Sequence, residues 1–205
     1  MPSKREQLKE SISARILSEA FEEFAEKGYT KTKLSDISQR AEVATGLVNK
    51  YFESKEKLFF ELIERRVFSD IFRSDENCTL DEALDSFLDE IKQSICADRT
   101  KAQFDRMLVS STDLPFEMLD IFPSIHAAEP LLNMIAQAQK RGDIPTSETP
   151  AGLLFALYKG TVIICRWYRE LGLPMPENDS LLFIIAYDRA AISEGRPTYF
   201  QLHKK

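Results

Sequence analysis

Residues 33–52 read KLSDISQRAEVATGLVNKYF. Apolar side chains recur in this stretch at three- and four-residue steps on either side of a break at residues 42–44, which is the spacing of one helix face. We therefore expect two short helices joined by a tight turn. The side chains that pack the two helices together are Ile37, Ala41, Val43, Leu47, Val48 and Phe52.

The polar face that remains on the second helix, residues 45–52, is narrow and suited to a nucleic acid. In a helix-turn-helix, the second helix enters the major groove with its N-terminal residues leading. Gly46 lets the backbone approach a phosphate without an intervening side chain. Asn49 is suited to a bidentate contact with adenine, and Lys50 to the acceptor atoms of guanine. Side chains suited to phosphate oxygens are Thr32, Thr45, Tyr51 and Lys55.

Helical patterns continue on both sides of this motif. Before it, apolar residues keep the helical period over residues 8–24, and Gly28 is suited to the left-handed position that ends a helix. Thr32 is the expected N-cap of the first short helix, and Ser54 that of a helix reaching about Phe72. On spacing alone, two short helices with a tight turn are equally compatible with an ordinary helical bundle.

The composition favours helices throughout the 205 residues. Glycine occurs only 7 times, and no proline lies between residues 3 and 114. Sheet proteins need these residues at their many turns, so an all-β fold is excluded. Capping signals at Thr79, Gly142 and Thr149 help to delimit about nine expected helices. The breaks between residues 111 and 130 stay open, because three prolines interrupt the pattern there: Pro115, Pro123 and Pro130.

The charge is distributed unevenly along the chain. The formal net charge of −6 by itself counts against a polyanionic partner. Residues 27–57, however, are locally basic, which is typical of a chain that meets a polyanion at one end, although an ordinary solvated helix surface has a similar composition. The basic side chains of this segment are Lys27, Lys31, Lys33, Arg40, Lys50, Lys55 and Lys57, and the acidic ones are Asp36, Glu42, Glu53 and Glu56.

Residues 41–59, AEVATGLVNKYFESKEKLF, closely resemble the signature of the TetR family of bacterial repressors. The resemblance extends over about residues 10–65. It implies an all-α chain with a three-helix helix-turn-helix domain at residues 1–70 and a helical ligand-binding and dimerisation domain at residues 71–205. The DNA contacts that it implies are Thr32, Ser35, Thr45, Gly46, Lys50, Tyr51 and Lys55.

Two positions depart from the family pattern. Glu42 stands where the family commonly has glycine, so a positive φ at this turn would strain the backbone. Asn49 stands where the family usually has an aromatic residue, often tyrosine. The phosphate contact of that tyrosine therefore does not carry over, and Asn49 becomes a candidate base reader instead.

The helices expected at residues 149–171 and 177–194 are apolar around their whole circumference. A helix of this kind in a water-soluble protein is buried on both sides. One side can pack on its own domain, and the other needs a partner. The resemblance implies that both helices pair with their copies in a homodimer, and the alternative is a central helix in a larger monomeric core.

The resemblance further implies an effector cavity in the C-terminal domain. Its candidate lining residues are Phe104, Met107, Leu108, Met118, Phe122, His126, Tyr158 and Trp167, although for any one of them the sequence favours plain core packing. His126 lies in an apolar region, where packing and ligand contact are both open roles. Nearby acidic residues favour a cationic apolar compound, and these are Asp105, Asp113, Glu117, Asp120 and Glu129.

Catalytic motifs are not apparent, since the chain has no Walker loop, no GxSxG, no HExxH and no ExxH histidine. We therefore expect no enzyme activity, no cofactor and no metal, in a cytoplasmic protein without a membrane segment. The resemblance implies a transcriptional repressor that binds a near-palindromic double-stranded DNA operator and is released by a small, largely apolar effector. Two alternatives stay open: a helical-bundle enzyme with a vestigial helix-turn-helix, and a regulator controlled by a protein partner.

Overall fold

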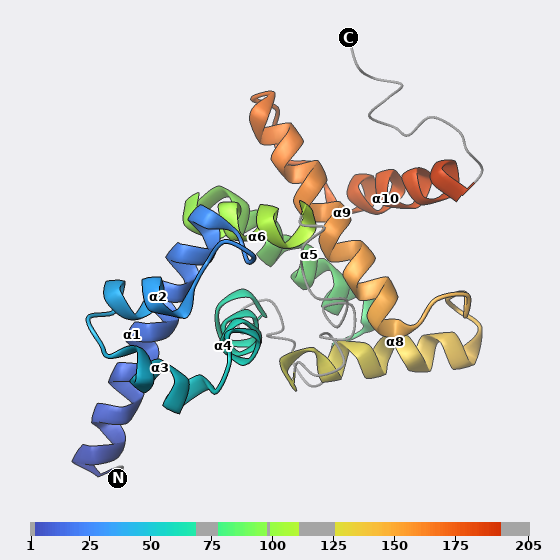
Figure 1. Ribbon diagram of the computed structural model, residues 1–205. Coiled ribbons are helices and arrows are strands. Elements are labelled where there is room, and N and C mark those ends of the chain that lie inside the picture. Colours follow the sequence, from blue (N-terminus) through green and yellow to red (C-terminus); the bar gives the residue numbers. More distant parts are fainter. Residues whose placement is uncertain (1–2, 69–77, 98, 111–125, 194–205) are drawn as a thin grey trace.

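The computed structural model describes residues 3–68, 78–97, 99–110 and 126–193 (Figure 1). In these ranges the chain forms nine α-helices, one short 3-10 helix and one π-helical segment, and no strand. The predicted all-α fold is confirmed. Of the proline-interrupted region, residues 111–125 lie outside the described residues.

The first four helices are α1 (Lys4–Lys27), α2 (Leu34–Arg40), α3 (Thr45–Phe52) and α4 (Lys55–Leu62), which gather on one side of the molecule (Figure 1). α1 packs on both α2 and α4, and α2 packs on α3. Their core is aromatic. The ring of Phe24 lies edge-on to that of Phe59 at 4.8 Å, and the ring of Tyr29 lies 4.8 Å from that of Phe59.

The turns of this part mostly follow the sequence signals. The Ser54 hydroxyl accepts a hydrogen bond from the backbone N–H of Lys57, which confirms the predicted cap. Glu42 has a φ of 52°, as expected where the family has glycine. Gly28 has a positive φ of 79°, but its ψ of 168° is extended rather than left-handed helical. The N-cap prediction for Thr32 is wrong, because α2 begins after Lys33 and has no side-chain cap.

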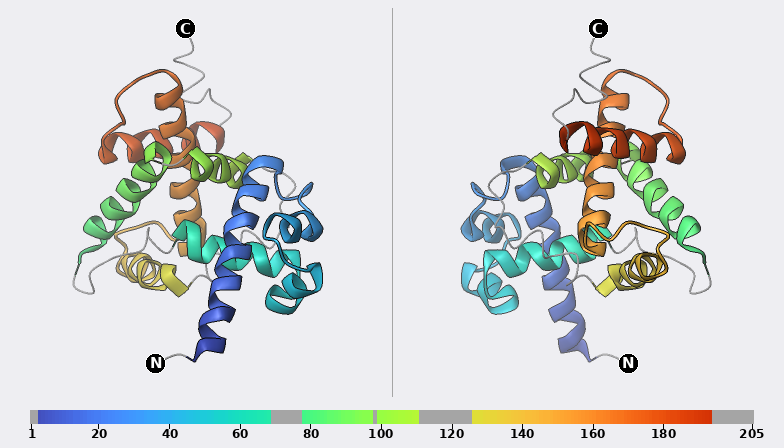
Figure 2. Two further views of the ribbon diagram at one scale, coloured as in Figure 1. Left: turned by 90° about the vertical axis from the view of Figure 1, so that its left-hand side faces the viewer. Right: turned by 90° about the vertical axis from the view of Figure 1, so that its right-hand side faces the viewer.

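The remaining helices are α5 (Leu80–Ala97), α6 (Arg99–Ser110), α8 (Glu129–Arg141), α9 (Pro150–Glu170) and α10 (Asn178–Ser193). The 3-10 turn η3 (His126–Ala128) precedes α8, and the π-helical segment η1 (Ile63–Phe68) continues α4. The predicted caps are confirmed at Thr79, Thr149 and Gly142. α9 packs against α5, α6, α8 and α10, so it is the central helix of this part (Figure 2).

The two parts of the chain share one continuous hydrophobic core. α6 provides the connection, since it packs on α1 on one side and on α5 and α9 on the other. The ring of Phe104 on α6 stacks on the ring of Phe21 with 4.8 Å between centroids, and lies 5.7 Å from the ring of Phe59. A shift of α6 therefore acts directly on α1 and α4, through Phe21 and Phe59.

The outer surface of α9 and α10 keeps large apolar side chains in contact with solvent. Ile163 on α9 is 42% exposed and Phe183 on α10 is 65% exposed. Ile185, in contrast, is only 7% exposed. It packs against Gly160 so closely that a Cβ atom there would lie 2.6 Å from its Cγ1. Ile185 therefore joins α10 to α9 within one chain.

Two further features follow from the apolar stretches and the cysteines. No helix among the described residues is long and apolar enough to cross a lipid bilayer. Cys78, Cys96 and Cys165 are all free thiols. Burial raises the pKa of the Cys165 thiol to about 12, so this group stays protonated and unreactive at neutral pH.

Candidate functional site

The outward face of α3 carries the polar residues that the sequence analysis selected. Val48 and Phe52 turn inward and are almost completely buried. The opposite face is open to solvent and holds Thr45, Gly46, Asn49 and Lys50, with Tyr51 half-buried at its edge. This face is narrow, polar and convex, which suits insertion into a major groove.

Gly46 lies in the first turn of α3 and is not required by internal packing. A Cβ atom added there would meet nothing within 4 Å. Its φ is not positive, so the backbone does not demand glycine either. The absence of a side chain therefore leaves the helix N-terminus open to a close neighbour from outside the chain.

A chain of hydroxyl groups joins α2 to α3. The Ser38 hydroxyl donates to the Ser35 carbonyl at 2.8 Å. It lies 2.7 Å from the Thr45 hydroxyl, which must then be the donor between them. Thr45 therefore fixes the start of α3 against α2, and its oxygen retains lone pairs rather than a free hydrogen. The Ser35 side chain is exposed beside it.

Two predicted phosphate donors have internal roles. Thr32 is only 1% exposed, and its hydroxyl lies 2.8 Å from the Gly28 carbonyl and 3.2 Å from that of Glu23. The Lys55 ammonium donates to the carbonyls of Tyr29 and Thr32, at 3.1 and 3.3 Å, and lies 4.3 Å from the centre of the Tyr29 ring. Thr32 therefore holds the loop between α1 and α2 against the end of α1, and Lys55 holds it against α4.

The Tyr29 ring completes this contact. Its hydroxyl donates to the Glu56 carboxylate at 3.1 Å. Burial raises the pKa of the Tyr29 hydroxyl, and the hydrogen bond to Glu56 and its charge raise it further. The phenol thus stays protonated as a donor, and the loop keeps its place relative to the start of α4.

Several of the basic residues of segment 27–57 are neutralised within the chain. Arg40 contacts Glu19, Glu23 and Glu26 of α1, at 3.1–3.3 Å. Lys27 pairs with Glu23 at 2.7 Å, and Lys57 pairs with Glu53. Within the described residues, the lysines of this segment that have no polar partner are Lys31, Lys33 and Lys50. The cationic surface is therefore smaller than the composition indicates.

Arg5 and Lys9 extend that surface, and sequence reasoning missed them. They lie on the first turns of α1 and line a groove of about 290 Å³ with Lys50 of α3. Its other lining residues are Leu8, Ile12, Leu47 and Tyr51. Leu8 is 62% exposed at this edge. The basic N-terminal residues were a signal, but only the packing of α1 shows that they adjoin the outward face of α3.

Residues 16–62 match the family model described as bacterial regulatory proteins, tetR family. This range contains α2, the turn and α3. These residues resemble the N-terminal part of TetR-family regulators. The predicted resemblance is confirmed, and the chain has the fold of a TetR-family DNA-binding regulator. No curated protein sequence matches the chain.

Solved structures of similar regulators support this TetR-family fold. The chain is 25% identical to native NalD of Pseudomonas aeruginosa, covering 86% of this chain and 95% of that one, with a TM-score of 0.55. It is 18% identical to Salmonella enterica GusR, covering 85% and 93%, with a TM-score of 0.58. It is 20% identical to FadR of Bacillus subtilis in complex with stearoyl-CoA, covering 84% and 96%, with a TM-score of 0.55.

The residues expected to line the effector cavity lie in different surroundings. Phe104, Met107, Leu108 and Tyr158 are buried in the core, whereas His126 is exposed at the start of η3. Trp167 lines a shallow groove of about 190 Å³ on α9, next to Ile163. Met118 and Phe122 lie outside the described residues.

Two of the five acidic residues expected near a cationic ligand, Asp105 and Glu129, are described by the structure. The carboxylate of Asp105, a buried residue, accepts a hydrogen bond from the Tyr158 hydroxyl at 2.8 Å and one from the Ser94 hydroxyl at 3.5 Å. Burial raises the pKa of Tyr158 well above its usual value, and the Asp105 charge adds to it. This cluster ties α5, α6 and α9 together. Glu129 is exposed, and Asp113, Glu117 and Asp120 lie outside the described residues.

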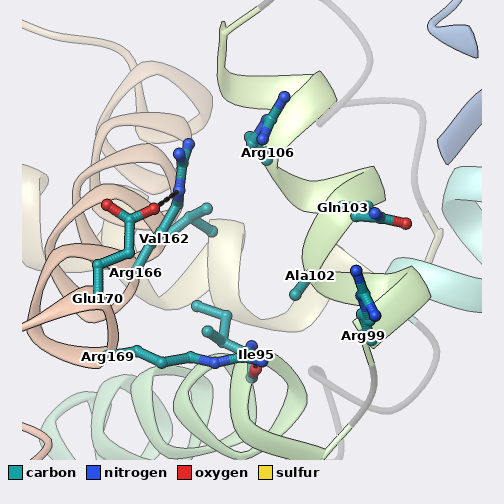
Figure 3. A pocket seen from close by; sticks show the side chains of 9 residues that line it. All are labelled: Ile95, Arg99, Ala102, Gln103, Arg106, Val162, Arg166, Arg169 and Glu170. Carbon is teal, nitrogen blue, oxygen red and sulfur yellow. Dashed lines mark hydrogen bonds and ion pairs between the residues drawn. The ribbon is translucent and has the colours of Figure 1, made fainter. Parts of the chain in front are cut away.

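A cleft of about 350 Å³ separates α6 from α9, with the end of α5 as its floor (Figure 3). Ile95, Ala102 and Val162 give it an apolar base. Around this base stand one carboxylate, Glu170, and four arginines: Arg99, Arg106, Arg166 and Arg169. None of these residues stands out in the sequence, because their shared location depends on how α6 packs against α9.

Proposed function

We propose that the chain is a transcriptional repressor that binds a near-palindromic operator as a homodimer and is released by a small effector. The observation that carries the proposal is the outward face of α3, where Gly46, Asn49 and Lys50 lie exposed beside the cations of α1. Support for repression comes from the related NalD, which is described as a secondary repressor of a multidrug efflux pump. We assign residues 1–70 to DNA binding and residues 71–205 to dimerisation and effector binding.

The DNA contacts fall into two groups in this proposal. Asn49 and Lys50 read base edges in the major groove, Ser35, Gly46 and Tyr51 approach the backbone, and Thr45 orients the start of α3. Arg5 and Lys9 join them as phosphate contacts from α1. Thr32 and Lys55 act through the loop that they hold, and the remaining N–H of Lys55 is available to a phosphate.

Dimerisation through α9 and α10 is supported by their exposed apolar side chains. Phe183 lies on the outer face of α10, where burial against a second copy removes apolar surface from water. For such a dimer to bind DNA, the two α3 helices must lie on one side of it. The operator is then expected to repeat its half-sites about 34–36 Å apart.

Release by an effector requires that the C-terminal helices act on α3. Phe104 supports such a route, since its ring joins α6 to Phe21 of α1 and Phe59 of α4. The proposed effector contacts α6 and α9, which carry Phe104, Met107, Leu108, Tyr158 and Trp167. The related FadR, which was solved with stearoyl-CoA, supports a ligand with a long apolar part.

The test is selection of DNA fragments by the purified full-length protein, followed by sequencing. We expect enrichment of a near-palindromic motif. Asn49→Ala should relax the preference at one base position of each half-site, while Asn133→Ala on the exposed surface of α8 should select the wild-type motif. Failure to enrich any motif would contradict DNA recognition, and enrichment of a single asymmetric half-site would contradict the homodimer.

A further inference from the structure

We propose that the cleft between α6 and α9 binds the carboxylate or phosphate group of an amphipathic effector, whose apolar chain lies along the neighbouring surface of α9. The role of this ligand as an effector rests on the proposed regulatory function. Its binding rests on the geometry of the cleft alone.

The charges of the cleft are the first argument. Four arginines and one carboxylate line it, in a chain whose formal net charge is −6. Arg166 donates through Nε to Glu170 at 2.7 Å, so this carboxylate is engaged by one of the four. Arg169 donates through Nη1 to the Ile95 carbonyl at 2.7 Å, which offsets no charge. The positive charges of the arginines repel one another, and a bound anion lowers the electrostatic free energy of the cluster.

Arg99 and Arg106 are the arginines best placed to bind a ligand. They lie seven residues apart on one face of α6, together with Ala102 and Gln103. Neither has a hydrogen-bond or ion-pair partner among the residues that the structure describes. Each guanidinium presents several N–H donors in a planar fork, which matches the two oxygens of a carboxylate or phosphate.

The surroundings of the cleft indicate the rest of the ligand. A shallow groove of about 190 Å³ shares Val162, Arg166 and Glu170 with the cleft and extends past Val109, Ile163 and Trp167. The apolar surface therefore begins where the cationic cleft ends. An oxyanion with an attached hydrocarbon chain meets both surfaces at once, whereas a small inorganic anion leaves the groove uncovered.

The location also supplies a route to the DNA-binding domain. Arg99 and Arg106 lie on the same helix as Phe104, whose ring packs on α1. Thr100, next to Arg99, donates a hydrogen bond to Glu22 of α1 at 3.3 Å. An anion that draws α6 toward α9 thus acts on both contacts with α1.

Direct binding is measured on the full-length protein through Trp167, which is the single tryptophan of the chain. The probes share a ten-carbon chain below its micellar concentration: decanoate, decyl phosphate, decanol and decyltrimethylammonium. We expect saturable changes in fluorescence with at least one of the two anions, and binding at least about tenfold weaker for the neutral and cationic probes. The tighter of the two anions identifies the group as carboxylate or phosphate.

Variants locate the site. Arg106→Gln and Arg99→Gln should each weaken anion binding about tenfold, and Arg141→Gln on α8 should leave it within about twofold. Equal binding of the neutral or cationic probe, or unchanged anion affinity in both cleft variants, would overturn the proposal. Suppose that Arg106→Gln binds the anions as the wild type does but shows a weaker salt dependence of operator binding. The arginine would then contact a DNA phosphate, and the cleft proposal would be overturned.

The experiments distinguish an error in the anion-binding proposal from an error in the proposed regulatory function. If no anion binds but operator binding is intact, the cleft proposal is wrong and the DNA-binding function stands. If the anions bind through the arginines but leave operator affinity unchanged, the anion site is supported and the regulatory role assigned to it is removed.

Discussion

The ring of Phe104 on α6 stacks on the ring of Phe21 on α1, with 4.8 Å between their centroids and 26° between their planes. Both side chains are buried, so the contact transmits displacement instead of absorbing it. It joins the helices that carry the arginine cleft to the helix on which α2 and α4 pack. Among the described residues, it is the shorter of the two ring contacts that join Phe104 to the first four helices, the other being with Phe59.

Replacement of Phe104 by leucine should therefore reduce the coupling between effector and operator. Between sites of this kind, a ligand weakens the other site's affinity about 5- to 150-fold. With a ligand that releases the wild-type protein, we expect Phe104→Leu to shrink this factor toward one in anisotropy titrations. Phe87→Leu on α5 is the control, since Phe87 is equally buried and its helix packs mainly on α6, α8 and α9. Equal loss of coupling in both variants would identify general loosening of the core as the cause.

Lys50 and Lys55 should separate DNA binding from stability. Lys50→Ala removes an exposed cation, so operator affinity should fall and its salt slope should decrease by about 0.9 if a phosphate contact is lost, with unfolding unchanged within about 0.5 kcal/mol. Lys55→Ala removes two hydrogen bonds from an ammonium group and should lower the free energy of unfolding by about 1.5–3 kcal/mol. Urea denaturation and anisotropy at several salt concentrations measure both effects. Lys140→Ala on α8 should change neither.

Gly46→Ala should stabilise the fold and weaken DNA binding. The added methyl group meets no atom of the chain within 4 Å, and alanine favours a helix over glycine by about 0.5–1 kcal/mol. The same methyl group stands between the start of α3 and a phosphate. A thermal melt should show the gain, and operator affinity should fall at least about tenfold, a difference of about 1.4 kcal/mol. Unchanged affinity would mean that the backbone at residue 46 does not approach DNA.

A charge on the outer surface of α10 should separate the proposed dimer without unfolding the chain. Phe183 is 65% exposed, so Phe183→Glu is expected to give folded monomers with weakened operator binding. Ile185→Glu places a charge in the packed contact with Gly160 and should unfold or aggregate the protein instead. Sedimentation velocity and circular dichroism distinguish the two results. A wild-type protein that sediments as a monomer at micromolar concentration would contradict this interface.

The turn between α2 and α3 holds Glu42 at a φ of 52°, where a side chain is strained. Glu42→Gly relieves this strain but adds freedom to the unfolded chain, so we expect a net gain of up to about 1 kcal/mol in unfolding free energy. The matched change Gln39→Gly, in the last turn of α2, should instead cost about 0.5–1 kcal/mol. A destabilised Glu42→Gly variant would show that this side chain has a role beyond the turn.

The local patterns of the sequence determined the helices, most of their caps and the outward face of α3. The helical period and the capping residues act over three or four positions, so they are visible without knowledge of the fold. The resemblance over residues 10–65 added the family, because its motif lies within one contiguous stretch. The strained turn at Glu42 was predictable for the same reason.

Only the tertiary structure decided which side chains remain available at the surface. Arg40 and Lys55 count as basic in the sequence, but the first is neutralised by glutamates of α1 and the second holds carbonyls of a neighbouring loop. Arg5 adjoins α3, and Arg99 shares a cleft with Arg166, although the partners are far apart in the chain. Charges pair through space over a few ångströms, so no spacing along the sequence records which of them have already found a partner.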